Sequence, residues 1–243
     1  MTLAVLIPVK DLSQAKTRLA HLLSAEERLA LAGIMLAGVL EAVSRLPAAA
    51  DGEGLQRVVV TVHAASAELG RRLGFEILSE PRPQSESDSV DRASAHLEAE
   101  GARGVLRIPL DLPLIAAEDL ERLMATIREG CAAVLVPSLS GTGTNALYRS
   151  PPTLFPSRFG PGSLALHERA ARRRAQDVRL LPLASLALDV DDPDDVRELV
   201  RRAQPCAALD YLRARGIEER LARLDAPGKA AESRPATRFR SGS

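Results

Sequence analysis

The chain has 243 residues, of which 46% are hydrophobic, so it is long enough for one large α/β domain or two small ones. Its 32 basic and 32 acidic side chains cancel, which argues against a protein held on nucleic acid or on a membrane surface by a basic field. Aromatic residues make up only 2% of the chain, too few for the stacking platforms of a single-strand binder. We therefore expect no nucleic-acid partner.

The cysteines and the first residues of the chain indicate the cellular compartment of the protein. Cys131 and Cys206 are too few and too far apart for a disulfide framework or a zinc cluster, which favours a reducing environment. The opening apolar run, residues 3–9, is too short for a membrane span and lacks the basic start and cleavage site of a signal peptide. We expect a soluble cytoplasmic protein with no membrane partner.

Short apolar runs alternate with stretches of helical periodicity along most of the chain. Continuous apolar runs of this length are typical of strands buried on both faces of a parallel sheet. The predicted strands cover residues 3–9, 57–62, 75–78, 104–108, 132–137, 178–181 and 186–190. The predicted helices cover residues 24–46, with a capping box of Ser24 and Glu27, then 65–73, 89–100, 116–129, 163–175 and 193–203. The alternation predicts an α/β fold with a mostly parallel sheet and helices on both faces.

The chain is predicted to form one domain followed by two appended segments. The domain covers residues 1–203, with a loop at 47–54, and residues 204–225 are predicted to be a helical extension. Residues 226–243 are rich in Arg, Ser, Pro and Gly, which is typical of a disordered tail. The extension is expected to pack either on its own domain or on a second copy of the chain, so the sequence leaves the choice between a monomer and a homodimer undecided.

A basic loop follows the first predicted strand, and ligands of such sheets bind at the carboxyl ends of the strands. Lys10, Lys16 and Arg18 lie within nine positions of one another. They suit the phosphates of a nucleotide. Alternatively, they form an ordinary solvent-exposed basic loop before a helix. The loop has neither GxGxxG nor GxxxxGK, which argues against a P-loop enzyme and against the usual dinucleotide fold.

Three acids are placed at the ends of other predicted strands. Asp111 follows the strand at 104–108, where it suits either a divalent cation or a helix cap. Asp189 and Asp191 alternate along the last predicted strand, so they share one face and repel each other unless a cation lies between them. Asp192 is instead predicted to cap the helix that begins at Pro193. The pattern favours a metal site of Asp111, Asp189 and Asp191.

Two small-residue turns indicate an anion site. Residues 140–145 form a turn of Gly, Ser and Thr before a strand, and residues 158–163 end at Ser163, where a helix is predicted to begin. Bared backbone amides, hydroxyls and a helix N-terminus bind anions well, although each turn alone is common. His167 lies one turn into that helix, where it either faces the anion site or is an ordinary surface or partly buried side chain.

Five motifs together resemble a known family. They are IPVKDLSQAKTRL at 7–19, DLPLI at 111–115, GTGTNAL at 141–147, RFGPGS at 158–163 and LDVDDPDD at 188–195. In combination they resemble the guanylyltransferases that begin the side chain of coenzyme F-420. These enzymes belong to the nucleotidyltransferases with a Rossmann-like fold, related to the molybdopterin and sugar-phosphate enzymes. The resemblance covers about residues 3–203.

The resemblance implies an activity and its substrates. It implies transfer of GMP from GTP to the phosphate of 2-phospho-L-lactate, phosphoenolpyruvate or 3-phospho-D-glycerate, with release of pyrophosphate. It also implies two Mg²⁺ ions on Asp111, Asp189 and Asp191. The positions that match those holding the phosphorylated acid are Thr144, Gly160 and Ser163. The second pKa of a phosphate ester is about 6, so the acceptor is already mostly a dianion at neutral pH and no general base is needed.

The nucleotide is expected to lie against the basic loop, with Lys10, Lys16 and Arg18 on its phosphates. Relatives usually carry a Gly-Leu-Asn element near the base, where this chain has residues 85–92, so Asp91 or Asp88 is expected to select guanine. Two alternatives remain at this point. One is a related transferase that uses CTP or another acceptor, and the other is a catalytically silent module that binds a nucleotide or a phosphorylated acid.

Overall fold

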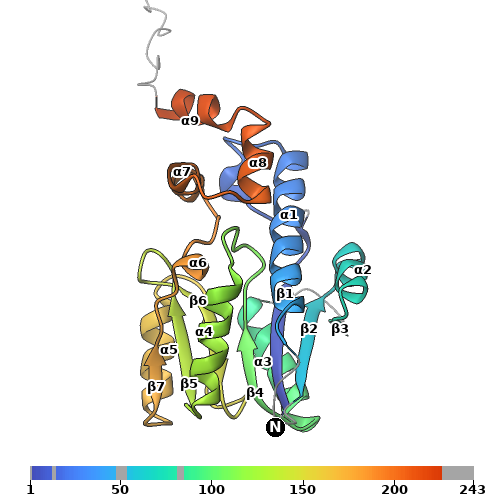
Figure 1. Ribbon diagram of the computed structural model, residues 1–243, viewed down its shortest axis with the longest axis vertical. Coiled ribbons are helices and arrows are strands. Elements are labelled where there is room, and N and C mark those ends of the chain that lie inside the picture. Colours follow the sequence, from blue (N-terminus) through green and yellow to red (C-terminus); the bar gives the residue numbers. More distant parts are fainter. Residues whose placement is uncertain (1, 13–14, 48–53, 81–84, 226–243) are drawn as a thin grey trace, which may run out of the picture.

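One sheet organises the protein, which is described by a computed structural model for residues 2–12, 15–47, 54–80 and 85–225. In these residues the sheet has the strand order β3-β2-β1-β4-β6-β5-β7 (Figure 1). The strands are β1 Thr2–Val9, β2 Leu55–Thr61, β3 Glu76–Ser79, β4 Ala102–Arg107, β5 Ala133–Pro137, β6 Thr144–Arg149 and β7 Val178–Leu180. All neighbouring strands are parallel except β6, which runs antiparallel to both β4 and β5. The predicted α/β fold with a mostly parallel sheet is confirmed.

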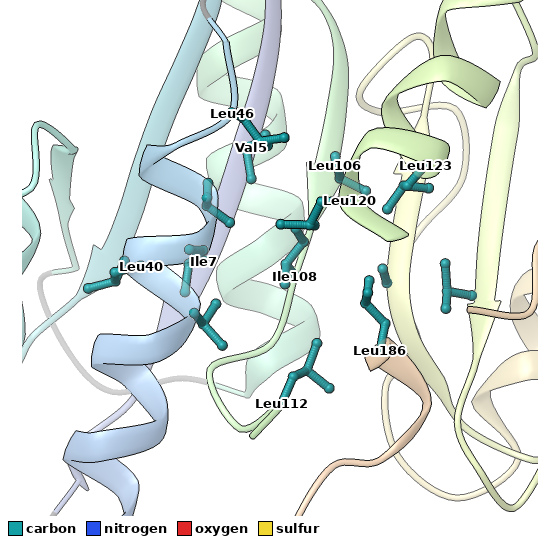
Figure 2. Close-up of a cluster of buried hydrophobic side chains, with 14 of the residues drawn as sticks. Val5, Ile7, Leu40, Leu46, Leu106, Ile108, Leu112, Leu120, Leu123 and Leu186 are labelled. Carbon is teal, nitrogen blue, oxygen red and sulfur yellow. The ribbon is translucent and has the colours of Figure 1, made fainter. Parts of the chain in front are cut away.

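Helices cover both faces of this sheet. They are α1 Ala25–Ser44, α2 Ala64–Arg72, α3 Glu86–Ala99, α4 Ala117–Arg128, α5 Ser163–Arg172, α6 Ala184–Ala187, α7 Pro193–Arg202, α8 Ala207–Arg213 and α9 Ile217–Asp225. Side chains alternate along β1, so Val5 and Ile7 are buried with residues of α1 and α4, whereas Ala4 and Leu6 are buried with residues of α3. Figure 2 shows the first of these two clusters.

Side-chain caps begin two of the helices as predicted. The Ser24 hydroxyl accepts a hydrogen bond from the Glu27 N–H at 3.2 Å, and the Glu27 carboxylate accepts one from the Ser24 N–H at 2.9 Å. Asp192 and Asp195 form the same reciprocal arrangement at α7, where Pro193 is the first helical residue. Such caps satisfy amides that have no partner within the helix. Asp192 therefore has the structural role expected of it.

The strand predicted at 186–190 is wrong. The chain forms the short helix α6 there, and residues 188–190 continue as an extended segment outside the sheet. The reason lies in Leu183 and Leu186, which are three residues apart and both buried, as one helical turn allows. The extended segment is held instead by its backbone, since the Val190 N–H donates to the Asp111 carbonyl at 3.2 Å.

The last three helices lie beyond the carboxyl ends of the parallel strands (Figure 1). α8 packs against α1, so the predicted helical segment 204–225 contacts its own domain. A second apolar cluster, here called the cap cluster, joins these helices to the loops at the sheet edge. Its members include Leu19, Leu22, Leu114, Leu188, Val190, Leu199, Leu209, Leu212, Ile217 and Leu221.

Some sequence-based expectations cannot be compared with the structure. The tail predicted at 226–243 and most of the loop predicted at 47–54 lie outside the described residues. Among the helices that are described, none combines the length and the apolar character needed to cross a membrane.

Candidate active site

The three predicted acids meet at the edge of the sheet where the parallel strands end. Asp111 follows β4, while Asp189 and Asp191 lie on the extended segment after α6. Burial, together with the negative charges of Asp111 and Asp191, raises the pKa of Asp189 to about 6. The repulsion acts between Asp189 and each of the other two acids, which both contact the Lys16 ammonium. The structure therefore brings together residues that are up to 80 positions apart in the chain.

Lys16 lies between two of these acids. Its Nζ donates to Asp111 Oδ2 at 2.6 Å and to Asp191 Oδ1 at 2.7 Å, and its side chain is only 4% exposed. Burial alone lowers the pKa of an ammonium, but the charges of Asp111 and Asp191 outweigh this effect and raise the pKa of Lys16. Lys16 is thus a permanent cation at neutral pH. Of the three predicted nucleotide cations, Lys10, Lys16 and Arg18, it is the most buried.

Asn145 fixes the third acid from another strand. Its Nδ2 donates to Asp189 Oδ1 at 3.1 Å and to the carbonyls of Leu186 and Ala187, both at 2.8 Å. Because β6 is antiparallel to its neighbours, its first residues lie at the edge where the parallel strands end. The sequence did not assign Asn145 a role, although it stands in the GTGTN motif directly after Thr144.

Two cavities open on either side of Asp111 and Asp191. Cavity A, of about 440 Å³, is lined by Lys10 and Lys16, and cavity B, of about 420 Å³, is lined by Asp189. Cavity B also contains the three residues expected to hold the phosphorylated acid, which are Thr144, Gly160 and Ser163. Asp111 and Asp191 line both cavities, so the acids form part of the boundary between them.

Two predicted nucleotide residues take other positions. Arg18 lines cavity B and does not line cavity A, where Lys10 and Lys16 lie. Asp91 lines neither cavity, because its carboxylate accepts hydrogen bonds from the Ser157 N–H and from Arg149 Nη1, each at 2.9 Å. The structure does not bring Asp91 to the candidate site, where it was expected to select guanine.

Arg107 and Glu86 are polar residues of the site that the sequence did not single out. Both line both cavities, and they form an ion pair. Arg107 Nη1 also donates to the Asn145 carbonyl at 3.1 Å, and the guanidinium carbon lies 4.2 Å from the centre of the Phe159 ring. A single arginine in the apolar run GVLRI was the available signal for Arg107.

Thr144 and Ser163, which line cavity B, form a hydrogen-bonded group with the buried side chain of His167 behind them. His167 Nε2 accepts from the Arg158 N–H at 2.8 Å, so the ring proton lies on Nδ1 and is donated to Thr144 Oγ1 at 3.0 Å. The Ser163 hydroxyl donates more weakly to the same oxygen, at 3.4 Å. With its oxygen accepting, the Thr144 hydroxyl keeps its own proton for donation to another group. His167 is therefore buried beside the predicted anion site.

We expect His167 to make folding stability depend on pH. Burial, and then the charges of Arg149 and Arg107, lower its pKa to about 4, whereas an unfolded histidine titrates near 6.5. Between these values the unfolded chain binds more protons, so stability falls as pH falls. From pH 7 to pH 5 the loss attributable to His167 is roughly 2 kcal/mol, measurable by urea unfolding at both pH values.

The control for this expectation is a comparison of variants. His167→Gln should remove most of that difference between the two pH values, whatever its effect at pH 7. The variant of the exposed His21, His21→Gln, should retain the difference. An unchanged pH dependence in His167→Gln would contradict the assignment.

The acids suit a magnesium ion by their chemistry, but Lys16 contacts two of them. Carboxylate oxygens are the ligands that Mg²⁺ prefers, and a cation would relieve the repulsion that raises the pKa of Asp189. Within the described ranges, no three His, Cys, Asp or Glu side chains are already grouped as metal ligands. The donor set therefore fits Mg²⁺ provided that the Lys16 ammonium gives up part of its contact with Asp111 and Asp191.

The fold is similar to those of two proteins of known structure. A putative nucleotide-diphospho-sugar transferase from Desulfovibrio desulfuricans aligns with 91% of this chain and 97% of its own, with a TM-score of 0.70 and 16% identity. A CMP:2-keto-3-deoxy-manno-octonic acid synthetase solved with CTP aligns with 84% of this chain and 100% of its own, with a TM-score of 0.54 and 14% identity. At these identities the similarity concerns the fold alone.

Sequence comparison identifies the family. Residues 3–227 match the family described as Guanylyl transferase CofC like, and the chain belongs to this family. It is 37% identical to a phosphoenolpyruvate guanylyltransferase of Rubrobacter xylanophilus over 200 residues, which are 82% of this chain and 94% of the relative. It is 35% identical to a 3-phospho-D-glycerate guanylyltransferase of Phenylobacterium zucineum over 195 residues, 79% of this chain and 86% of the relative. The resemblance seen in the sequence motifs is confirmed.

Proposed function

We propose that this protein transfers GMP from GTP to the phosphate of a small phosphorylated acid and releases pyrophosphate, in the biosynthesis of coenzyme F-420. The acceptor is 2-phospho-L-lactate, phosphoenolpyruvate or 3-phospho-D-glycerate. One observation carries the proposal: Asp111 and Asp191 stand between a cavity lined by lysines and a cavity lined by hydroxyl groups. The names of the relatives from R. xylanophilus and P. zucineum support the same activity.

Each cavity contains groups that suit one of the two substrates. Lys10 and Lys16 in cavity A would neutralise the triphosphate, while Thr144 and Ser163 in cavity B would donate hydrogen bonds to the phosphorylated acid. An acceptor phosphate oxygen then attacks the α-phosphorus, the bond from that phosphorus to the bridging oxygen breaks, and pyrophosphate leaves with the bonding electrons. The acceptor is already a dianion, so the chain needs to position and neutralise it rather than to remove a proton.

Magnesium is part of this proposal. Asp111, Asp189 and Asp191 would hold the ions, whose charge would offset that of the reacting phosphates when they are bound. The residues of the chain supply the remaining positive charge. Arg107 lies at the boundary of both cavities, where its guanidinium can face phosphates on either side.

A matrix of substrates tests the function. GTP, CTP and ATP are each offered with the three acids and Mg²⁺, pyrophosphate release is measured, and each product is identified by mass. We expect a guanylylated product with at least one acid, and no pyrophosphate when the acid or Mg²⁺ is omitted. A cytidylylated or adenylylated product in its place would contradict guanylyl transfer. Nucleotide binding without any product would instead indicate a catalytically silent module.

A further inference from the structure

Cavity A contains polar atoms whose hydrogen-bonding capacity is unused. Glu80 Oε1, Ser89 Oγ and Arg107 Nε are buried and have no hydrogen-bond partner among the described residues. All three residues line cavity A. Buried polar atoms in proteins are nearly always paired, so three unpaired atoms around one cavity indicate a ligand that supplies their partners. This ligand must offer both donors and acceptors.

The position of Glu80 separates it from the phosphate-binding part of the cavity. Glu80 follows β3, next to the end of β2, where Val60 and Val62 contribute apolar surface to the same cavity. The cavity is lined near β1 and β4 by Lys10, Lys16 and Asp111. A flat ring with a polar edge fits an apolar wall bordered by a carboxylate. The end of cavity A at β2 and β3 therefore suits a nucleobase, with its phosphates toward Lys16.

Other acids near this end are already engaged. Glu86 pairs with Arg107. Asp88 accepts a hydrogen bond from the Ser85 hydroxyl at 2.6 Å, next to the start of α3. Glu80 is thus the residue whose carboxylate oxygen is buried at cavity A and has no partner in the described part of the chain.

We propose that Glu80 selects the guanine base, an inference that rests on the proposed use of GTP. Guanine presents two adjacent donors, N1–H and the N2 amino group, and a carboxylate can accept from both. Adenine and cytosine each place an unprotonated ring nitrogen beside the amino group, so a carboxylate would face a lone pair there. The Ser89 hydroxyl on the same wall can donate a hydrogen bond to O6 of guanine. Adenine has an amino group at this position, which cannot accept that hydrogen bond.

Inosine nucleotides isolate the contact to the amino group, because they differ from guanosine nucleotides only in lacking N2. For the wild type, we expect kcat/KM with GTP to exceed that with ITP by about 30-fold, the usual effect of one hydrogen bond to a charged group. In Glu80→Gln this ratio should fall to about 3-fold, mainly through a higher KM for GTP. The matched control is Glu76→Gln, on the exposed end of β3 with Gln56 as its partner, which should keep the wild-type ratio.

Binding measurements keep this inference separate from the proposed function. Calorimetry with GDP, IDP and ADP reports base selectivity without turnover. If wild type prefers GDP and Glu80→Gln loses the preference, the role of Glu80 stands even when no acid is guanylylated. If wild type transfers GMP but Glu80→Gln retains both the GTP/ITP and the GDP/ADP ratios, the role of Glu80 is overturned and the function stands.

A second variant guards against a general disturbance of the cavity. GTP and ITP share O6, so Ser89→Ala should lower kcat/KM for both nucleotides by a similar factor of about 10. The ratio of kcat/KM for GTP to that for ITP should therefore stay unchanged. A fall of the GTP/ITP ratio in Ser89→Ala equal to that in Glu80→Gln would overturn the assignment of the amino group to Glu80. Thermal unfolding midpoints confirm that each variant is folded.

Discussion

Replacing Asp111 with asparagine is expected to lower kcat/KM for guanylyl transfer by about 10³-fold or more while the protein remains folded. The side chain keeps its shape but loses the charge that faces both cavities and accepts a hydrogen bond from Lys16. Asp111 is also the residue whose backbone carbonyl holds the segment of the other two acids, and the substitution preserves that contact. The measurement is pyrophosphate release at saturating Mg²⁺, with GTP and the acid that the wild type prefers.

The control for Asp111→Asn is the same change at Asp210, which is exposed on α8 and lines neither cavity. Asp210→Asn should leave kcat/KM within about twofold of the wild type, because surface substitutions away from a site have small effects. Activity of Asp111→Asn within tenfold of the wild type, with a normal unfolding midpoint, would refute a metal-binding role for Asp111.

Replacing Lys16 with methionine is expected to lower both stability and activity. Removing one partner of a buried ion pair leaves an uncompensated charge, at a cost of about 3–5 kcal/mol. Here Asp111 and Asp191 would face each other without the ammonium that each contacts. The pKa of Lys16 is raised, so its contribution is fully present at neutral pH and is lost only as pH rises above the ordinary range of lysine. The unfolding midpoint should fall by several degrees.

Magnesium distinguishes this effect from a simple packing defect. In Lys16→Met a divalent cation can take the place of the ammonium, so added Mg²⁺ should raise the unfolding midpoint more than it does in the wild type. Lys10→Met, which removes a lysine that is exposed in the same loop, should leave the unfolding midpoint and its response to Mg²⁺ unchanged. Equal responses to Mg²⁺ in wild type and Lys16→Met would show that the ion does not compete with Lys16 for these acids.

The sequence predicted the α/β fold because short apolar runs alternate with stretches of helical periodicity, two of which begin with a recognisable cap. The error at 186–190 arose from the same type of signal. A short apolar run is compatible with a buried strand or with one turn of a buried helix, and the choice depends on what packs around it. Alternation within 188–191 was nevertheless informative, because Leu188 and Val190 are buried in the extended segment while Asp189 and Asp191 are more exposed.

The sequence predicted the acids of the site but only part of its surroundings. Residues that follow parallel strands meet at one edge, which is why Asp111 could be placed there from the sequence. Asp189 was placed at the same edge through a predicted strand that the structure replaces with α6 and an extended segment. The interest of Glu80 and Arg107 lies in one buried atom of each, Oε1 and Nε, that has no partner among the described residues. Whether an atom is left unpaired depends on the neighbours in space, which the sequence does not show. Asp91 was expected to bind guanine because a carboxylate can accept two hydrogen bonds, but the sequence did not show where this carboxylate lies. In the fold it accepts a hydrogen bond from Arg149.

The cap cluster connects the candidate site to helices that lie far from it along the chain. Leu19 follows the loop of Lys16, Leu114 follows Asp111, and Leu188 precedes Asp189, and all three pack in one cluster with residues of α7, α8 and α9. Shortening the protein before Ala207 would remove apolar contacts from the segments that position Lys16, Asp111 and Asp189. A screen for altered turnover numbers should therefore recover substitutions within residues 207–225, none of which lines either cavity, and a shortened form should not serve as a minimal catalyst.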